Sequence, residues 1–254
     1  MKVLILCGGQ GTRAYPYTRH MPKALMPVAG VPVVEQVMRI YASHGFDEFV
    51  LAVGHLKDDL FAYFRHRTDW NVECVDTGES SDTGDRVRLC LDYVSDHFHT
   101  TYCDGLGNVD IRALTAYHDS HGDGATLTAA PLRSQYGVLD ADEDGRVTRF
   151  VEKPVLADYW INAGFFIFDK AAIASTPGSN LERDVLPALA LRRSLRVFRH
   201  KGFWRSMDTY KDQQELDMLW GPFSDALDDR SPAGAAAVPQ WLHSRYALMT
   251  KDLT

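Results

Sequence analysis

Residues 2–13 read KVLILCGGQGTR, in which an apolar run at residues 3–6 passes directly into a glycine-rich turn that Arg13 closes. The run has the length and composition of a buried strand. Glycines carry no Cβ, so the backbone N–H groups of residues 8–11 can approach a phosphate closely. Lys23 follows ten residues after Arg13 and supplies a second cation. The stretch therefore predicts a strand that ends in a phosphate-binding loop.

Three interpretations of this turn compete. A plain strand-ending turn explains the glycines but gives the two cations no role. Gly9, Gly11 and Ala14 also match the G-x-G-x-x-[GA] fingerprint of a dinucleotide-dependent oxidoreductase, which requires a helix that begins on the glycines. Four prolines between residues 16 and 32 forbid that helix, and no Gly-Lys-Ser/Thr follows as in a Walker-type loop. We therefore favour a long, cation-bearing loop that wraps a nucleotide.

Composition narrows the class of protein. The 254 residues include 34 acidic and 27 basic side chains, so the net charge of −7 argues against a nucleic-acid partner. The four cysteines show no C-x-x-C spacing, which is typical of free thiols in a reducing compartment. No apolar run reaches the roughly 18 residues of a membrane span, and no signal-peptide pattern opens the chain. We expect a cytoplasmic protein with no membrane partner, and we also expect a homo-oligomer.

Strand-like and helix-like segments alternate along the first half of the chain. Strands are predicted at residues 2–6, 48–53, 71–75 and 98–103, and helices at 33–44, 58–67, 86–94 and 111–121. This alternation predicts an α/β fold with a Rossmann-like, doubly wound, mostly parallel sheet, whose ligands gather at the carboxyl ends of the strands.

From about residue 126 the pattern changes to shorter extended pieces around Gly/Asp turns. These pieces, at residues 126–131, 136–140, 147–152 and 161–168, predict a small antiparallel extension of the sheet. A helix over 181–191 with Asn180 as its N-cap, a strand over 195–200 and a helix over 209–220 follow. We predict one domain over residues 1–220, with halves that meet near residue 125, and a C-terminal tail over 221–254.

Asp104 and Asp208 each follow an apolar or aromatic approach and each precede a turn or a helix start. Either residue alone is as well explained by a turn or an N-cap. Mg²⁺ is usually held by one or two carboxylates together with substrate phosphates, so the pair fits a magnesium site beside the glycine loop.

Glu152, Lys153 and the Asn162–Gly164 segment form a third group. A carboxylate, an ammonium and an Asn-Gly pair would suit a sugar phosphate, but each is equally ordinary at a strand end or turn. On spacing alone the two interpretations stay open.

The order of these motifs resembles that of the sugar-1-phosphate nucleotidylyltransferases. The shared motifs are GGQGTR, the Lys23 segment, the strand end at Asp104, Glu152-Lys153-Pro154, Ile161 to Phe165, and FWRSMDT at residues 203–209. Within that family, the loop at residues 75–84 is most similar to glucose-1-phosphate cytidylyltransferase. The resemblance extends over nearly the whole chain to Trp220.

The resemblance implies a role for each matching residue. Gly8, Gly9, Gly11, Thr12 and Arg13 would hold the nucleoside triphosphate, with Lys23 between the reacting phosphates. Thr83 and Gly84 would lie beside the base and ribose. Asp104 and Asp208 would hold Mg²⁺. Gly137, Glu152, Lys153, Asn162 and Gly164 would bind the sugar phosphate. Residues 1–125 would then be the nucleotide-binding half and residues 126–220 the sugar-phosphate half.

The implied reaction is attack of a sugar 1-phosphate on the α-phosphorus of a nucleoside triphosphate, with release of pyrophosphate. CTP and glucose 1-phosphate are favoured. Ala24, Cys103 and Asp85 depart from the family pattern, and Asp85 would place a carboxylate near the base. Guanylyl, thymidylyl and uridylyl transfer therefore stay open, as do a modified hexose or a heptose as the sugar. A non-catalytic nucleotide-sugar-binding regulatory subunit is the remote alternative.

Overall fold

The computed structural model describes residues 1–122, 124–228 and 242. A seven-stranded sheet lies at its centre, in the strand order β12-β8-β11-β6-β1-β4-β5. In chain order these strands are β1 (Val3–Leu6), β4 (Glu48–Val53), β5 (Asn71–Asp76), β6 (His97–Tyr102), β8 (Ala125–Arg133), β11 (Val155–Asp169) and β12 (Leu195–Arg199). The described helices of six or more residues are α1 (Val33–Ala42), α2 (Lys57–Phe64), α3 (Thr83–Leu89), α4 (Ile111–His121), α5 (Lys170–Ser175), α6 (Leu186–Leu191) and α7 (Tyr210–Asp228).

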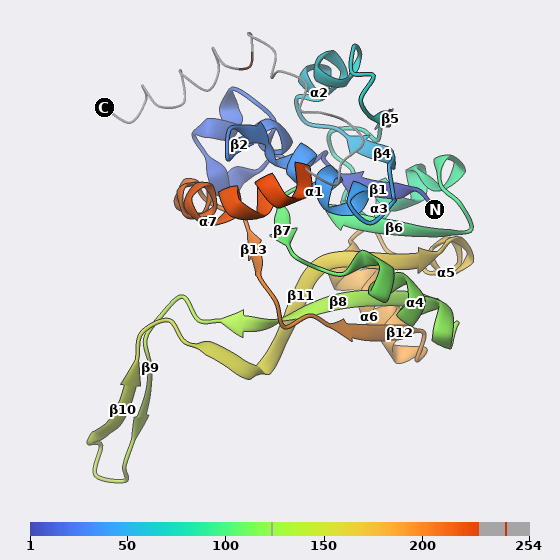
Figure 1. The fold of residues 1–254 in the computed structure, drawn as a ribbon. Coiled ribbons are helices and arrows are strands. Elements are labelled where there is room, and N and C mark those ends of the chain that lie inside the picture. Colours follow the sequence, from blue (N-terminus) through green and yellow to red (C-terminus); the bar gives the residue numbers. More distant parts are fainter. Residues whose placement is uncertain (123, 229–241, 243–254) are drawn as a thin grey trace.

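Six strands of the central sheet point the same way. β1 pairs in parallel with β4 and β6, β4 with β5, and β8 with β12, whereas β11 runs antiparallel to both β6 and β8. The predicted mixed, mostly parallel sheet is confirmed. Its antiparallel component is the single long strand β11, which continues out of the sheet (Figure 1).

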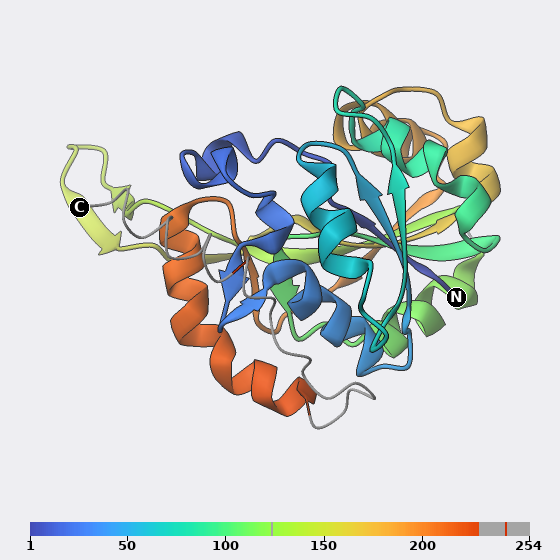
Figure 2. The same ribbon diagram turned by 90° about the horizontal axis from the view of Figure 1, so that it is seen from above.

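Alternate residues of the buried strands face two separate apolar layers. Val3 and Ile5 of β1 join the core that α1, α2, α4 and α7 cover, while Leu4 and Leu6 face α3, α5 and α6. Figure 2 shows the sheet passing between α3 and α5 on one side and α1, α4 and α7 on the other. Because both faces are covered, the strands are continuous apolar runs, as the first stretch of the sequence indicates.

The segment between the glycine turn and α1 is more regular than the extended loop that we expected. It contains 3₁₀ turns at Thr12–Ala14, Tyr17–Arg19 and Lys23–Leu25, and a two-stranded ribbon of β2 (Pro27–Val28) and β3 (Val31–Pro32). Prolines fix φ near the helical value and tolerate first-turn positions, so they break a long helix without excluding single turns. The segment still contains no α-helix on the glycines, as the nucleotide-loop interpretation requires.

A second ribbon, of β7 (Gly105–Gly107) and β13 (Trp204–Ser206), was not predicted from the sequence. Three residues per strand are too few to give a periodic signal. α3 also begins at Thr83, earlier than the predicted Arg86, because the Asp82 side chain accepts a hydrogen bond from the Thr83 backbone N–H and caps the helix.

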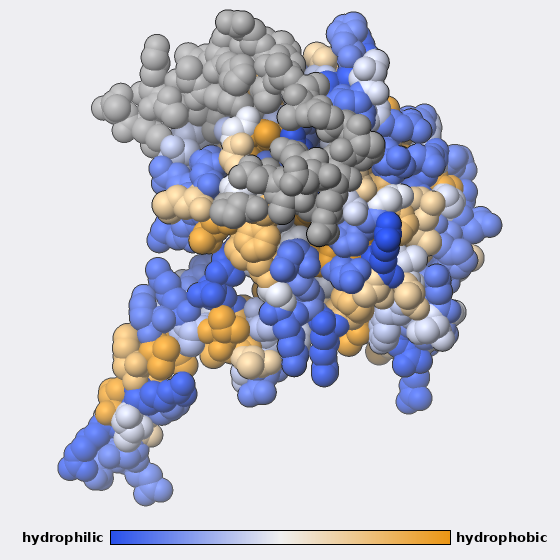
Figure 3. Space-filling model, viewed as in Figure 1, coloured by the Kyte–Doolittle hydropathy of each residue, from blue (hydrophilic) through white to orange (hydrophobic). Residues whose placement is uncertain are grey.

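The strands β9 (Val138–Ala141) and β10 (Val147–Val151) form a hairpin arm that projects from the body (Figure 1). Large side chains are exposed on and beside it, and the aliphatic and phenylalanine residues among them are orange in Figure 3. The exposed side chains include Tyr136, Leu139, Val147, Phe150 and Tyr159. The arm explains why the sequence changes its pattern after residue 126.

Strands from both sides of residue 125 share the central sheet, and α7 continues past Trp220 to Asp228. The predicted division at residue 125 and the C-terminal tail stay predictions, and most of the tail lies outside the described residues. Within residues 1–122, 124–228 and 242, no helix is long and apolar enough to cross a membrane.

Phe98 tests the packing of the sheet. Its side chain is fully buried in β6, between β1 and β11. Replacement Phe98→Ala leaves a cavity, so we expect the free energy of unfolding to fall by about 3–5 kcal/mol in urea titrations. Leu191→Ala, at an 88% exposed position, is the control and should change it by less than about 0.5 kcal/mol. Equal losses in the two variants would contradict the assigned core.

Candidate active site

The carboxyl ends of β1 and β6 open into a cavity of about 530 Å³. Nine of the predicted site residues line it: Gly8, Gly9, Gly11, Arg13, Lys23, Thr83, Asp104, Asn162 and Asp208. The position agrees with the rule for doubly wound sheets, in which ligands bind beyond the carboxyl ends of the strands. Segments that are far apart in the sequence, from residues 6–23 to residues 204–208, meet at this cavity.

The glycine turn is shaped by two close approaches. A Cβ on Gly8 would lie 2.0 Å from Nη1 of Arg86, so any larger residue would displace that guanidinium. Gly11 has a left-handed φ of 62°, and its carbonyl accepts a hydrogen bond from Oγ1 of Thr18 at 3.1 Å. A Cβ on Gly9 would meet nothing within 4 Å, so the protein itself does not require a glycine there.

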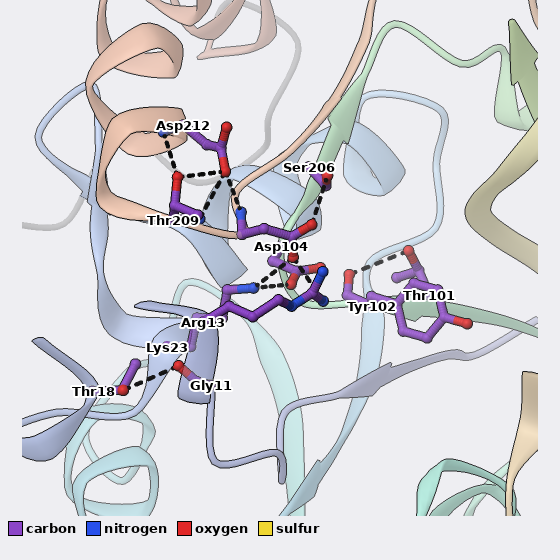
Figure 4. Close-up of polar contacts among 11 residues, drawn as sticks. Gly11, Arg13, Thr18, Lys23, Thr101, Tyr102, Asp104, Ser206, Thr209 and Asp212 are labelled. Atoms are coloured by element: carbon purple, nitrogen blue, oxygen red, sulfur yellow. Dashed lines mark hydrogen bonds and ion pairs between the residues drawn. The ribbon is translucent and has the colours of Figure 1, made fainter. Parts of the chain in front are cut away.

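Four charged side chains converge on the cavity. Figure 4 shows Arg13 and Lys23 beside Asp104. Nζ of Lys23 lies 2.5 Å from Oδ2 of Asp104 and 3.3 Å from Oδ1 of Asp208. Nη2 of Arg13 lies 2.9 Å from the same Oδ1 of Asp208. Arg13 is mostly exposed, whereas Lys23 is only 9% exposed. We call these four residues the charge cluster.

Burial and charge act on Lys23 in opposite directions. Burial lowers the pKa of Lys23, but the carboxylates of Asp104 and Asp208 outweigh it, so that its pKa is raised. The ammonium therefore stays protonated at neutral pH. It offers a fixed positive charge to a phosphate that enters the cavity.

The β7–β13 ribbon brings the two carboxylates together. Ser206 pairs with Gly105, and the backbone N–H of Met207 donates to the carbonyl of Asp104 at 2.9 Å. Asp208 follows directly, and its own backbone N–H donates to the Asp212 carboxylate at 3.1 Å. Two residues that are far apart in the sequence are thus adjacent in space.

The donor set suits a magnesium ion. Asp104 and Asp208 offer only oxygen ligands, they share Lys23 as a partner, and they face a cavity that solvent can enter. Hard cations such as Mg²⁺ prefer such oxygens and keep waters or phosphates as further ligands. The residues present therefore fit the ion that the sequence suggests.

Arg86 is a site residue that the sequence analysis missed. Its guanidinium, buried below the glycine turn, donates to the carbonyl of Gly8 at 2.9 Å, to that of Gly78 at 2.8 Å and to Oγ1 of Thr77 at 2.5 Å. It thereby fixes the glycine turn against the 77–79 loop. The sequence signal was weak, because an arginine in a predicted helix is usually on the surface.

Glu182 was also missed. Its carboxylate accepts from Oγ1 of Thr83 at 2.8 Å and from the hydroxyl of Tyr102, which in turn accepts from Nδ2 of Asn162 at 3.3 Å. Burial, and then the Glu182 carboxylate, raise the pKa of Tyr102, so the phenol stays neutral. This network joins the predicted base side of the cavity to the predicted sugar side. In sequence, Glu182 is indistinguishable from an acidic residue in the first turn of a helix.

Comparison with known proteins agrees with this geometry. The family model described as "Nucleotidyl transferase" matches residues 2–204, which include the whole charge cluster except Asp208. The chain belongs to the nucleotidyl transferase family. It is 36% identical over 247 residues to glucose-1-phosphate cytidylyltransferase of Salmonella typhi, covering 87% of this chain and 96% of that protein. It is 34% identical over 246 residues to the probable glucose-1-phosphate cytidylyltransferase of Bacillus subtilis, with coverage of 87% and 96%.

A solved structure shares the fold. The crystal structure of a putative glucose-1-phosphate thymidylyltransferase from Bacillus anthracis superimposes with a TM-score of 0.68 at 19% identity, covering 87% of this chain and 95% of that one. The likeness supports the nucleotidyl transferase architecture of the central sheet.

Six predicted site residues do not line the cavity of this nucleotidyl transferase: Thr12, Gly84, Gly137, Glu152, Lys153 and Gly164. Gly137 and Glu152 lie next to each other at the base of the hairpin arm, where a Cβ on Gly137 would be 3.0 Å from Oε2 of Glu152. Gly164 has a φ of 78°, and a Cβ there would be 2.4 Å from the Tyr102 ring. A glycine at position 164 therefore allows the chain to pack against the Tyr102 ring beside the cavity. The proposed ligand contacts of all six residues stay predictions.

The buried guanidinium of Arg86 generates a test. Arg86→Met leaves the Gly78 carbonyl and Oγ1 of Thr77 without this donor, and the Gly8 carbonyl keeps only the backbone N–H of His55, so we expect a loss of about 3 kcal/mol in unfolding free energy. Because the glycine turn is released, the KM for the nucleotide should also rise at least about tenfold. The control is Arg146→Met, which removes an exposed ion pair on the arm and should change neither quantity measurably. An unchanged nucleotide KM in folded Arg86→Met would contradict the positioning role.

Proposed function

We propose that this nucleotidyl transferase transfers the cytidylyl group of CTP to glucose 1-phosphate, giving CDP-glucose and pyrophosphate. The observation that carries the proposal is the charge cluster, in which two cations and two carboxylates converge beside an open glycine turn. The extent and level of identity to the cytidylyltransferases favour this pair of substrates within the family.

The cavity residues support a direct transfer. A phosphate oxygen of the sugar 1-phosphate forms a bond to the α-phosphorus, and the bond from that phosphorus to the β-phosphate oxygen breaks, with its electron pair leaving on pyrophosphate. The glycine turn orients the triphosphate, Arg13 neutralises the departing phosphates, and Lys23 lies between the two reacting groups. The attacking phosphate is already an anion, so no side chain has to remove a proton. Accordingly, no histidine occurs among the described residues that line the cavity.

Asp104 and Asp208 are the residues that would hold Mg²⁺. When bound, the ion supplies neutralising charge to the phosphates and helps to orient them. Within the protein alone, Lys23 holds both carboxylates at the cavity, and the side chain of Ser206 donates to Oδ2 of Asp208 at 3.3 Å.

Residues 81–83 line the cavity, which supports a subsite for the base beside them. Asp85 does not line the cavity. The Asp85 carboxylate instead faces Nη1 of Arg88 at 3.2 Å and is partly exposed. An ion-paired carboxylate outside the cavity is a poor reader of a base edge. The departure of Asp85 from the family pattern therefore does not argue against cytosine.

We also propose that the enzyme is a cytoplasmic homo-oligomer. Its four cysteines are free thiols, as proteins of a reducing compartment have. The exposed apolar side chains of the hairpin arm support contact with a second copy of the chain.

A substrate screen tests the proposed function. Pyrophosphate release is measured for CTP, GTP, UTP, dTTP and ATP, each combined with glucose 1-phosphate, mannose 1-phosphate and a heptose 1-phosphate. We expect CTP with glucose 1-phosphate to give the highest kcat/KM, at least about tenfold above every other pair. A higher value for another pair would overturn the assigned substrates. No release from any pair would favour a non-catalytic subunit.

The charge cluster gives a second test. Lys23→Ala and Asp104→Asn should each lower kcat at least about a hundredfold, as expected when one transition-state partner is removed. Lys170→Ala changes a lysine at the start of α5, away from the cavity, and should keep wild-type kcat. Unfolding curves check that each variant is folded. Near-wild-type turnover in either cluster variant would refute the proposed mechanism.

A further inference from the structure

Three side chains that the proposed reaction does not use meet near the other end of the sheet. Nδ1 of His97 and Nε2 of His118 lie 2.6 Å and 3.1 Å from the same oxygen, Oδ1 of Asp169. The three ligand atoms all lie within 4.8 Å of one another. His97 begins β6, whose carboxyl end leads to Asp104, so the length of that strand, about 20 Å, separates the group from the active site.

The fold fixes the position of each member. Asp169 and His97 are direct cross-strand partners in the antiparallel pair β11–β6, and α4 carries His118 over the same face of the sheet (Figure 1). The backbone N–H of Asp169 donates to Gly124 at 2.9 Å, and that of Lys170 donates to Asp96 at 2.7 Å. The backbone that carries the carboxylate is therefore held at two successive residues.

Two imidazole nitrogens and one carboxylate oxygen form a donor set typical of Zn²⁺, whereas Mg²⁺ prefers oxygen alone. A neighbouring hydroxyl suits the tautomer that a metal needs. Nδ1 of His118 lies 2.9 Å from Oγ1 of Thr126, which also lies 2.9 Å from Nε2 of His121. With an ion bound at Nε2, His118 would keep its proton on Nδ1 and donate it to Thr126, whose hydroxyl can donate to His121. Such a partner behind a histidine ligand both orients the ring and raises its basicity.

The site has an entry path. His118 is 2% exposed, but the side chain of His97 is 57% exposed. A tetrahedral zinc site spaces its ligand atoms by about 3.3 Å, slightly more than the hydrogen bonds seen here. Rotation of the exposed His97 ring can provide that space and leave the fourth position to water.

We propose that His97, His118 and Asp169 bind one Zn²⁺ ion that links α4 to strands β6 and β11. The ion would replace the two ring protons that otherwise hold the three side chains together by hydrogen bonds. This site is separate from the charge cluster, so its occupancy does not depend on whether the proposed transferase reaction is correct.

The test is calorimetric titration of the full-length protein with Zn²⁺ in the presence of excess Mg²⁺. We expect one equivalent of Zn²⁺ per chain in the wild type. His97→Ala changes a largely exposed residue and Asp169→Asn is isosteric, so both should fold, which unfolding curves verify. Each should weaken Zn²⁺ binding at least about tenfold.

His66→Ala is the matched control, because it removes an exposed histidine from the turn after α2 and should keep wild-type zinc binding. A wild-type protein that binds no Zn²⁺ overturns the proposal. An affinity loss smaller than about tenfold in either ligand variant also overturns it, because the ion would then bind elsewhere.

Discussion

The ion pairs of Lys23 with Asp104 and Asp208 are the constraint on which the site depends. Lys23 is almost fully buried, and an unpaired ammonium at that depth would be costly. The lysine can therefore remain there only if both carboxylates are brought to it. That requirement explains the proline-rich turns before α1 and the short β7–β13 ribbon, which deliver the partners from three distant parts of the chain.

The same constraint has a chemical consequence. A cavity that already contains fixed cations and carboxylates does not have to reorganise when a polyphosphate enters. Arg86 extends this preorganisation below the glycine turn, because its guanidinium holds the carbonyl of Gly8. The space over Gly9 is left open by the protein. The positive side chains of the cavity and the space over Gly9 thus both favour a polyphosphate ligand.

Much of the fold could be predicted from sequence, because strands buried on both faces are continuous apolar runs. β1, β4 and α4 were predicted to within one residue of their observed bounds. The short ribbons could not be predicted, since pairs of two or three residues carry no periodicity and are held by tertiary contacts. The proline-rich segment was predicted as irregular, but single 3₁₀ turns tolerate proline and formed there.

The site residues, like the strands, were predictable where the sequence itself carries a signal and not where tertiary contacts decide. Residues with a motif of their own, such as Arg13, Lys23, Asp104 and Asp208, were found from the sequence and do converge. Arg86 and Glu182 were missed, because their roles come from burial and from partners across the fold. Gly137, Glu152 and Lys153 lie beside the hairpin arm and do not line the cavity, so their proposed ligand contacts stay predictions.

We propose that Asp104 and Asp208 hold a cation for the triphosphate, with Lys23 between them. Calorimetric CTP binding with and without Mg²⁺, in the wild type and in Asp208→Asn, tests it most directly. We predict at least about tenfold tighter CTP binding with Mg²⁺ in the wild type, and loss of that gain in Asp208→Asn, whose metal-free affinity is unchanged or higher because a negative charge is gone. An undiminished Mg²⁺ gain in the variant would contradict the account.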